Sequence, residues 1–232
     1  MRKRFLSAPA SGTESKGSER HVNGPTPRLE SSIKKHLSPT LRNDGFVGSG
    51  RTFRRVSEDL ILVVQVQGSR FGGKFAVNLG IQPRSIPDVA GNSPDPTKIR
   101  EEHCEFRRRL SEAKSDQWWE HEGSTESMDA AVRAAALVYA TLGQRLFSEV
   151  SGPESPLRKV TPTQFEAGQY SFSGFGSTKV RMARSLALMR QSIGNLADAN
   201  AFARIALASL ANASAIRSEL EELCRVTEST QT

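Results

Sequence analysis

The sequence predicts an α+β fold: an antiparallel β-meander of three to five strands with one face packed by helices, followed by an alanine-rich C-terminal helical region. Three observations support it. Apolar residues alternate with period two between residues 51 and 81, which is typical of strands buried on one face. They recur at helical spacing on both sides of this region. Eleven alanines lie between Ala183 and Ala215, where leucines and methionines keep a helical spacing.

The composition divides the 232 residues into four parts. Residues 1–27 are rich in Ser, Gly, Pro and charge without apolar periodicity, and we expect a disordered basic tail. Residues 28–150 form the predicted α+β domain, and 151–177 are a linker or irregular segment with three prolines. Residues 178–226 are the predicted helical appendage.

Charge and cysteine content limit the classes of function. The net charge is +7, but the first 28 residues hold six bases and two acids and so account for +4 of it. The tail is therefore the main candidate for nucleic-acid contact, and acidic residues among the later arginines argue against a nucleic-acid surface on the folded part. Two cysteines without CxxC spacing exclude a disulfide scaffold and suit a reducing compartment. No apolar run approaches the ~18 residues of a membrane span, so we expect a cytoplasmic protein without a membrane partner.

The first predicted helix carries one apolar stripe. Leu29, Ile33, Leu37 and Leu41 recur every four residues and mark a single helical face. Ser38-Pro39 within this stripe fits an N-cap followed by proline at the first helical position. The segment is therefore predicted to be either one helix or two short helices divided at this point.

Three segments then alternate with period two: RTFRRV, LILVVQVQ and KFAVNLGI. Tight connections near Glu58-Asp59 and at 68–73 predict a meander with one fully apolar face under helices. The other face is predicted to be more polar, and carries Thr52, Arg54, Gln65, Gln67, Lys74 and Asn78.

The connection GSRFGGKF has nearly the spacing of a nucleotide-binding P-loop. Such a loop needs a helix after it and a Ser or Thr after the lysine to hold magnesium. Phe75 stands at that position, and the residues after it alternate like a strand. We therefore predict a hairpin in which Gly68, Gly72 and Gly73 adopt positive φ, and no nucleotide cofactor.

The remaining elements are expected from shorter patterns. Cys104, Phe106 and Leu110 share one side of an alternation that predicts a fourth strand or a short helix. In chain order, the other expected elements are a loop at 83–98, a helix from Met128 to Leu146, two helices divided at Gly194-Asn195, and a last helix from Ser214 to Arg225.

No catalytic, metal or cofactor residues are assigned, since HExxH and GxSxG are absent and the histidines do not cluster. Amides near strand centres predict either hydrogen bonds to a covering loop or a small recognition patch. The tryptophan pair predicts one ring in the core and one half-exposed, with a ligand or partner contact as the alternative. The candidate binding residues are Arg54, Gln65, Gln67, Asn78, Arg109, Trp118 and Trp119.

Taken together, LRNDGFVGSGRTFRRV, LVVQVQ, FAVNLGI, EHCEFRRRL and DQWWE resemble, in order and spacing, the bacterial family known as domain of unknown function 4304. The resemblance covers residues 29–150. It implies an α+β domain with an antiparallel sheet and implies no activity.

Two functional hypotheses follow. The first is a non-enzymatic binding or interaction protein, whose partner is another protein on the helical appendage or the polar sheet face; a second copy of the chain, docked through the C-terminal helices, is an alternative partner. The second is an enzyme or a small-anion-binding protein with a pocket near the polar face. A cleft lined by Arg54 or Arg109 with Gln65 and Trp119 would favour the second, and a flat face covered by helix would favour the first.

Overall fold

The computed structural model describes residues 28–113, 115–210 and 216–225. The predicted disordered tail, residues 1–27, lies outside the described residues.

One antiparallel sheet forms the centre of the fold, and the predicted α+β class is confirmed. Five strands follow one another in sequence order, and a short sixth strand pairs with the fourth. The register sets Gln65 opposite Thr52 on one side and opposite Asn78 on the other. The strands are β1 (Val47–Ser49), β2 (Thr52–Val56), β3 (Leu60–Gly68), β4 (Lys74–Pro83), β5 (Phe106–Arg109) and β6 (Trp119–Glu120).

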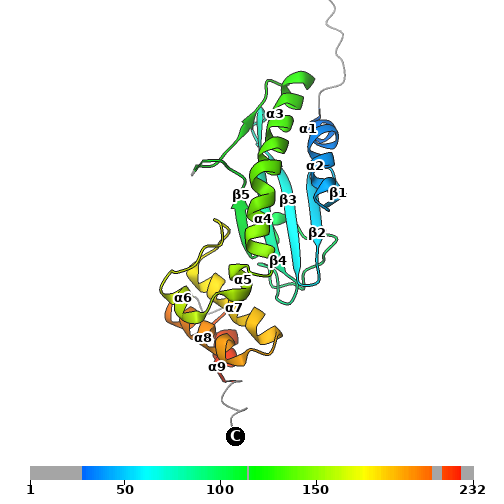
Figure 1. The fold of residues 1–232 in the computed structure, drawn as a ribbon. Coiled ribbons are helices and arrows are strands. Elements are labelled where there is room, and N and C mark those ends of the chain that lie inside the picture. The colour runs from blue at the N-terminus through cyan, green and yellow to red at the C-terminus, as the bar shows by residue number, and fades with distance from the viewer. Residues whose placement is uncertain (1–27, 114, 211–215, 226–232) are drawn as a thin grey trace, which may run out of the picture.

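Two helical segments cover one face of the sheet, with α3 and α4 in front of it and α1 and α2 beside them in Figure 1. The apolar sides of both segments join Phe53, Leu62 and Leu79 of the strands in one core. The first segment comprises α1 (Leu29–Ser32), the π-helical turn η1 (Ile33–Leu37) and α2 (Ser38–Asn43). The second comprises α3 (Thr125–Val138), the π-helical turn η3 (Tyr139–Gly143) and α4 (Gln144–Ser151).

Of the two alternatives at Ser38-Pro39, the structure has the single helical run and not the break. Ser38 has helical torsion angles (φ −54°, ψ −42°) and lies inside a continuous helical run, so it is no N-cap. The π-helical turn ends at Leu37, two residues before Pro39, and changes the hydrogen-bond pattern of the helix just ahead of the residue that has no N–H. Burial of Ile33, Leu37 and Leu41 favours a single helical face over the local signal.

Buried polar contacts tie the helical layer together. Tyr139 Oη donates to Asp44 Oδ2 at 2.5 Å, and Arg55 Nη1 donates to Asp44 Oδ1 at 2.6 Å. Burial and the neighbouring Asp44 carboxylate raise the pKa of Tyr139, so its hydroxyl stays a donor. Asp129 of α3 accepts from Lys35 Nζ at 2.7 Å, and this contact contributes to lowering the pKa of Asp129.

The glycine-rich connection is a hairpin turn, as predicted, because β4 begins at Lys74 and no helix follows it. Gly72 and Gly73 have φ of +73° and +67°, which glycine adopts without strain. Gly68 was also expected at positive φ and is not: it ends β3 as an ordinary strand residue. A Cβ there would lie 2.8 Å from Arg51 Nη1, the end of a flexible side chain that can move aside, so nothing in the structure requires glycine at this position.

The second face of the sheet is half apolar. Ile61 and Val63 pack there against Ile99 and Cys104 from the chain that follows β4. Cys104 was expected on the same side as Phe106 and Leu110, but it lies on the opposite face of the sheet from them. A Cβ on Gly80 would stand 2.7 Å from Cys104 Sγ, so the glycine lets this segment lie directly on the sheet.

The C-terminal helices gather below the sheet in Figure 1. The predicted division is confirmed, since Gly194 has φ +76° and Asn195 caps the next helix. The irregular segment contains two short helices. The elements are α5 (Pro156–Lys159), α6 (Pro162–Glu166), α7 (Lys179–Ser192), α8 (Leu196–Ala208) and α9 (Arg217–Arg225). In the part of the chain that the structure describes, no helix is both long and apolar enough to cross a bilayer.

Candidate functional site

A polar basin of about 650 Å³ lies on the sheet face opposite the helices. Its floor is formed by side chains of β3, β4 and β5, and its rim by the 3₁₀ turn η2 (Glu101–His103). The apolar cluster around Cys104 fills the neighbouring part of the same face, so the basin occupies the remainder. The residues used below are Gln65, Gln67, Asn78, Glu101, Glu102, Arg107 and Arg109.

Strand pairing puts the floor residues together. Asn78 of β4 is paired with Gln65 of β3 and with Arg109 of β5, so these side chains form a row across three strands. Gln67 Oε1 accepts from Asn78 Nδ2 at 2.9 Å and from Arg109 Nη2 at 3.1 Å. Within the described residues this leaves the Gln67 amide nitrogen as a donor and the Asn78 carbonyl oxygen as an acceptor for a ligand.

Gln65 holds the rim in place. Its Nε2 donates to Glu102 Oε2 at 2.8 Å, and its Oε1 accepts from the Glu101 backbone N–H at 3.0 Å. Glu102 also pairs with Arg100 Nε at 2.9 Å. Of the three strand amides, Gln65 is therefore the one that binds a covering segment, residues 101 and 102. Gln67 and Asn78 face the basin.

Two arginines give the basin positive charge that the neighbouring carboxylates pair only loosely. Arg107 forms no ion pair within the described residues, and its Nη1 donates only a 3.3 Å hydrogen bond to the Glu102 carbonyl oxygen. Arg109 Nη1 is buried without a hydrogen-bond partner, and the nearest carboxylate oxygen, Asp116 Oδ2, is 3.8 Å away. Burying a guanidinium nitrogen without a hydrogen-bond acceptor destabilises the protein. A ligand oxygen that accepts a hydrogen bond from this nitrogen would therefore be bound favourably.

The pKa values of the two rim carboxylates, Glu101 and Glu102, are shifted in opposite directions. Burial raises the pKa of Glu101, and the charges of Arg107 and Arg109 only partly oppose this effect. The pKa of Glu102 is lowered, because its hydrogen bonds and the Arg100 charge outweigh desolvation. Of the two rim glutamates, Glu101 is therefore the one that gains a proton more readily as the pH falls.

The structure brings four of the seven candidate residues together at the basin: Gln65, Gln67, Asn78 and Arg109. Trp118 lies next to it, with its ring 4.7 Å from Arg109 Cζ. Arg54 lies elsewhere and donates to the carbonyls of Ile99 and Lys98 at 2.6 and 2.9 Å. Trp119 stacks on Phe75 in the core, so the tryptophan pair divides into a buried and a half-buried ring, as predicted.

Sequence reasoning missed Arg107 and Glu101 as basin residues. Alternation along β5 could have placed Arg107 on the face of Arg109, since the two residues are separated by one position in a strand. Glu101 reaches the basin only because the chain after β4 folds back over the sheet. Over residues 28–113, 115–210 and 216–225, no three His, Cys, Asp or Glu side chains converge as metal ligands.

The sequence of this part of the chain resembles a known family. Residues 37–138 match the family described as Domain of unknown function (DUF4304). This confirms the resemblance found in the sequence. The DUF4304 segment contains the whole sheet, α3 and most of the basin, while Gly176 on the basin wall lies outside it. Neither the curated proteins nor the solved structures gave a match.

Proposed function

We propose that this protein is a non-enzymatic binding protein whose ligand is a small dianion held in the basin by Arg107 and Arg109. The observation that supports this most directly is the buried Arg109 Nη1, which lacks a hydrogen-bond acceptor. Guanidinium groups bind carboxylates and phosphate-like oxyanions through paired, charge-assisted hydrogen bonds.

The spacing of the two arginines favours a dianion. Residues two apart on a strand are about 6.5–7 Å apart and point the same way. Because both side chains leave the strand on the same side, two carboxylates of one molecule, or one tetrahedral oxyanion, can contact both guanidinium groups. The amide nitrogen of Gln67 supplies a third donor beside them.

The shape of the surface favours a small ligand over a protein partner on this face. The polar face is hollowed by the basin rather than flat. A cleft lined by Arg109, Gln65 and Trp119 was expected to favour a ligand pocket. Arg109 and Gln65 line the basin, whereas Trp119 packs in the core and does not.

The first test removes each arginine. We expect Arg107→Ala and Arg109→Ala each to weaken binding of sulfate and of succinate by about 10-fold to 100-fold, since a hydrogen bond to a charged group is worth roughly 1.5–3 kcal/mol. Calorimetry at low ionic strength measures the Kd for both anions. The matched control is Arg133→Ala, because Arg133 lies exposed on α3, the helix on the opposite face of the sheet.

The two anions distinguish the source of the ligand. Tighter sulfate binding points to a phosphorylated or sulfated ligand, and tighter succinate binding to a dicarboxylate. Either result supports the proposal if both basin arginines are needed. Binding that does not saturate, or that is equally weak in wild type and in both basin variants, contradicts it.

A second prediction concerns pH. As the pH falls toward the raised pKa of Glu101, its carboxyl gains a proton and the basin loses one negative charge. Sulfate keeps its charge over this range, so we expect its affinity to rise as the pH is lowered from 7.5, by about 3-fold to 10-fold once Glu101 is protonated, as for one charge at ~7 Å in a partly solvated site. Glu101→Gln should bind more tightly at pH 7.5 and lose most of the pH dependence.

The exposed Glu126→Gln on α3 is the control for this experiment. The other titrating groups near the basin, Glu102, His103 and Asp116, are the same in wild type and in Glu101→Gln. The difference between the two pH profiles therefore reports Glu101, and identical profiles would rule out its role.

A further inference from the structure

The chain before α7 binds the outer edge of β5. The Gly176 backbone N–H donates to the Arg107 carbonyl oxygen at 3.2 Å, and Arg108 Nη1 donates to the Ser173 carbonyl oxygen. Phe172 and Phe175 of the same segment are buried in the core. Backbone outside the DUF4304 segment therefore holds the strand that carries both basin arginines.

The turn in this segment is strained at the point where it meets Arg108. Ser173 has φ +49°, the one positive φ among the described residues other than glycine, and Gly174 follows at +77°. A Cβ on Gly174 would lie 2.7 Å from Arg108 Nη1. Such backbone persists only where the surrounding contacts fix it, and it is concentrated at functional sites.

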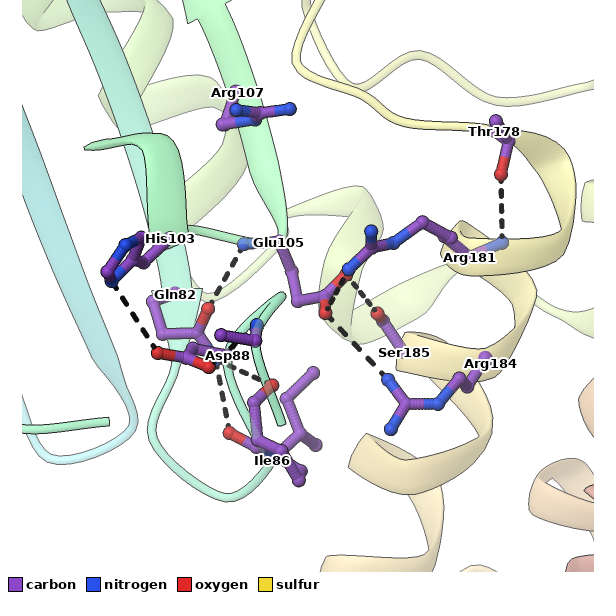
Figure 2. Close-up of polar contacts among 12 residues, drawn as sticks. Gln82, Ile86, Asp88, His103, Glu105, Arg107, Thr178, Arg181, Arg184 and Ser185 are labelled. Carbon is purple, nitrogen blue, oxygen red and sulfur yellow. Dashed lines mark hydrogen bonds and ion pairs between the residues drawn. The ribbon is translucent and has the colours of Figure 1, made fainter. Parts of the chain in front are cut away.

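A buried ionic network fixes the start of β5 to α7 (Figure 2). Glu105 is 2% exposed, and its backbone N–H donates to Gln82 Oε1 at 3.0 Å. Its carboxylate accepts from Arg181 Nη2 at 3.1 Å and from Ser185 Oγ at 3.2 Å. Arg184 Nη1 lies 3.8 Å from the same carboxylate.

This network extends to the last helix. Arg184 also forms two hydrogen bonds with Glu219 of α9, at 2.5 and 3.0 Å. Moving α7 away would leave the Glu105 carboxylate buried without its cationic partners, which strongly destabilises the fold. The ion pairs of Glu105 therefore keep α7 packed close to the sheet. Figure 2 shows Glu105 reaching toward α7, with Arg107 farther along the same strand.

We propose that residues 172–178 and α7 form a clasp that positions Arg107 and Arg109 in the basin, with Glu105 as its main positioning residue. The helical region is then part of the binding site, and the DUF4304 segment alone is incomplete. Glu105 lies two residues before Arg107, so a displacement of the chain at Glu105 moves the basin arginine as well. This inference rests on the proposed function of the basin.

The test uses the full chain and sulfate as the probe. We expect Glu105→Gln, which keeps the shape of the side chain but removes its charge, to raise the sulfate Kd about 3-fold to 10-fold. Glu166→Gln is the matched control, because this glutamate lies exposed on α6, outside the network around Glu105, and its Kd should change less than 2-fold. Amide hydrogen exchange gives a second readout: exchange at Gly176 should become at least 10-fold faster in Glu105→Gln, and exchange at Val64 should not change.

A second variant keeps the proposal testable if Glu105→Gln does not fold. In Gly174→Ala the added Cβ would clash with the Arg108 side chain and displace the clasp from β5. This variant should therefore also raise the sulfate Kd at least 3-fold. If both variants fold and bind sulfate like wild type while Arg107→Ala does not, the clasp is refuted and the basin remains. If Arg107→Ala also binds like wild type, the basin itself is refuted, and the clasp with it.

Discussion

We expect Leu62→Ala to lower the free energy of unfolding by about 2–5 kcal/mol, the range found for buried leucines. Leu62 is 4% exposed and lies on β3, on the sheet face that the helices cover. Its neighbours across the strands are Ile81 of β4 and Arg55 of β2. Since Ile81 is itself completely buried, the truncated side chain leaves a cavity that these neighbours cannot fill without moving.

Denaturant titration of wild type and variant measures this loss. Leu137→Ala is the matched control, because the same side chain on α3 is 66% exposed, and its effect should stay within about 0.5 kcal/mol. A loss below ~0.5 kcal/mol for Leu62→Ala would mean that this side of β3 does not face the core.

The strands could be predicted because their signals are local. Period-two alternation fixed which residues of β2, β3 and β4 face the helices, and a phenylalanine after Lys74 distinguished a hairpin from a phosphate loop. The floor of the basin follows from the same alternation, since Gln65, Gln67 and Asn78 come to the polar face of neighbouring strands.

The rest of the basin depends on contacts between distant parts of the chain. Glu101 reaches the rim because Gly80 leaves room for the segment that carries Cys104, and this packing has no periodic signature. Gly176 reaches the wall through one backbone bridge to Arg107, 69 residues earlier in the chain. The same limit explains Arg54, whose bonds to the carbonyls of residues 98 and 99 withdraw it from the site.

At Ser38-Pro39 the packing of the helix against the core outweighs the local preference of a Ser-Pro pair for a helix start. A serine before proline is a good N-cap in isolation, yet Leu37 and Leu41 are both completely buried in the same core. Interrupting the helix between them would expose part of that surface, so tertiary packing decides the conformation.

We expect Arg190→Met to destabilise the C-terminal helices by about 2–4 kcal/mol, because it leaves two buried carbonyl oxygens without donors. Arg190 is 3% exposed and donates to the carbonyl oxygens of Leu157 and Val160, each at 3.0 Å. Its guanidinium also lies 5.7 Å from the ring centre of Phe202 on α8. Methionine fills a similar volume, so the loss reports the hydrogen bonds rather than a cavity.

Hydrogen exchange of α7 amides under mild denaturant measures this effect, because it follows the opening of the C-terminal helices separately from that of the sheet. Arg133→Met on the exposed side of α3 is the control and should change stability by less than about 0.5 kcal/mol. Each alanine of α7 and α8 buries little area, so apolar packing alone gives these helices modest stability. Unchanged exchange in Arg190→Met would show that such packing is nevertheless sufficient, and that the buried arginine does not hold α5 and α8 to α7.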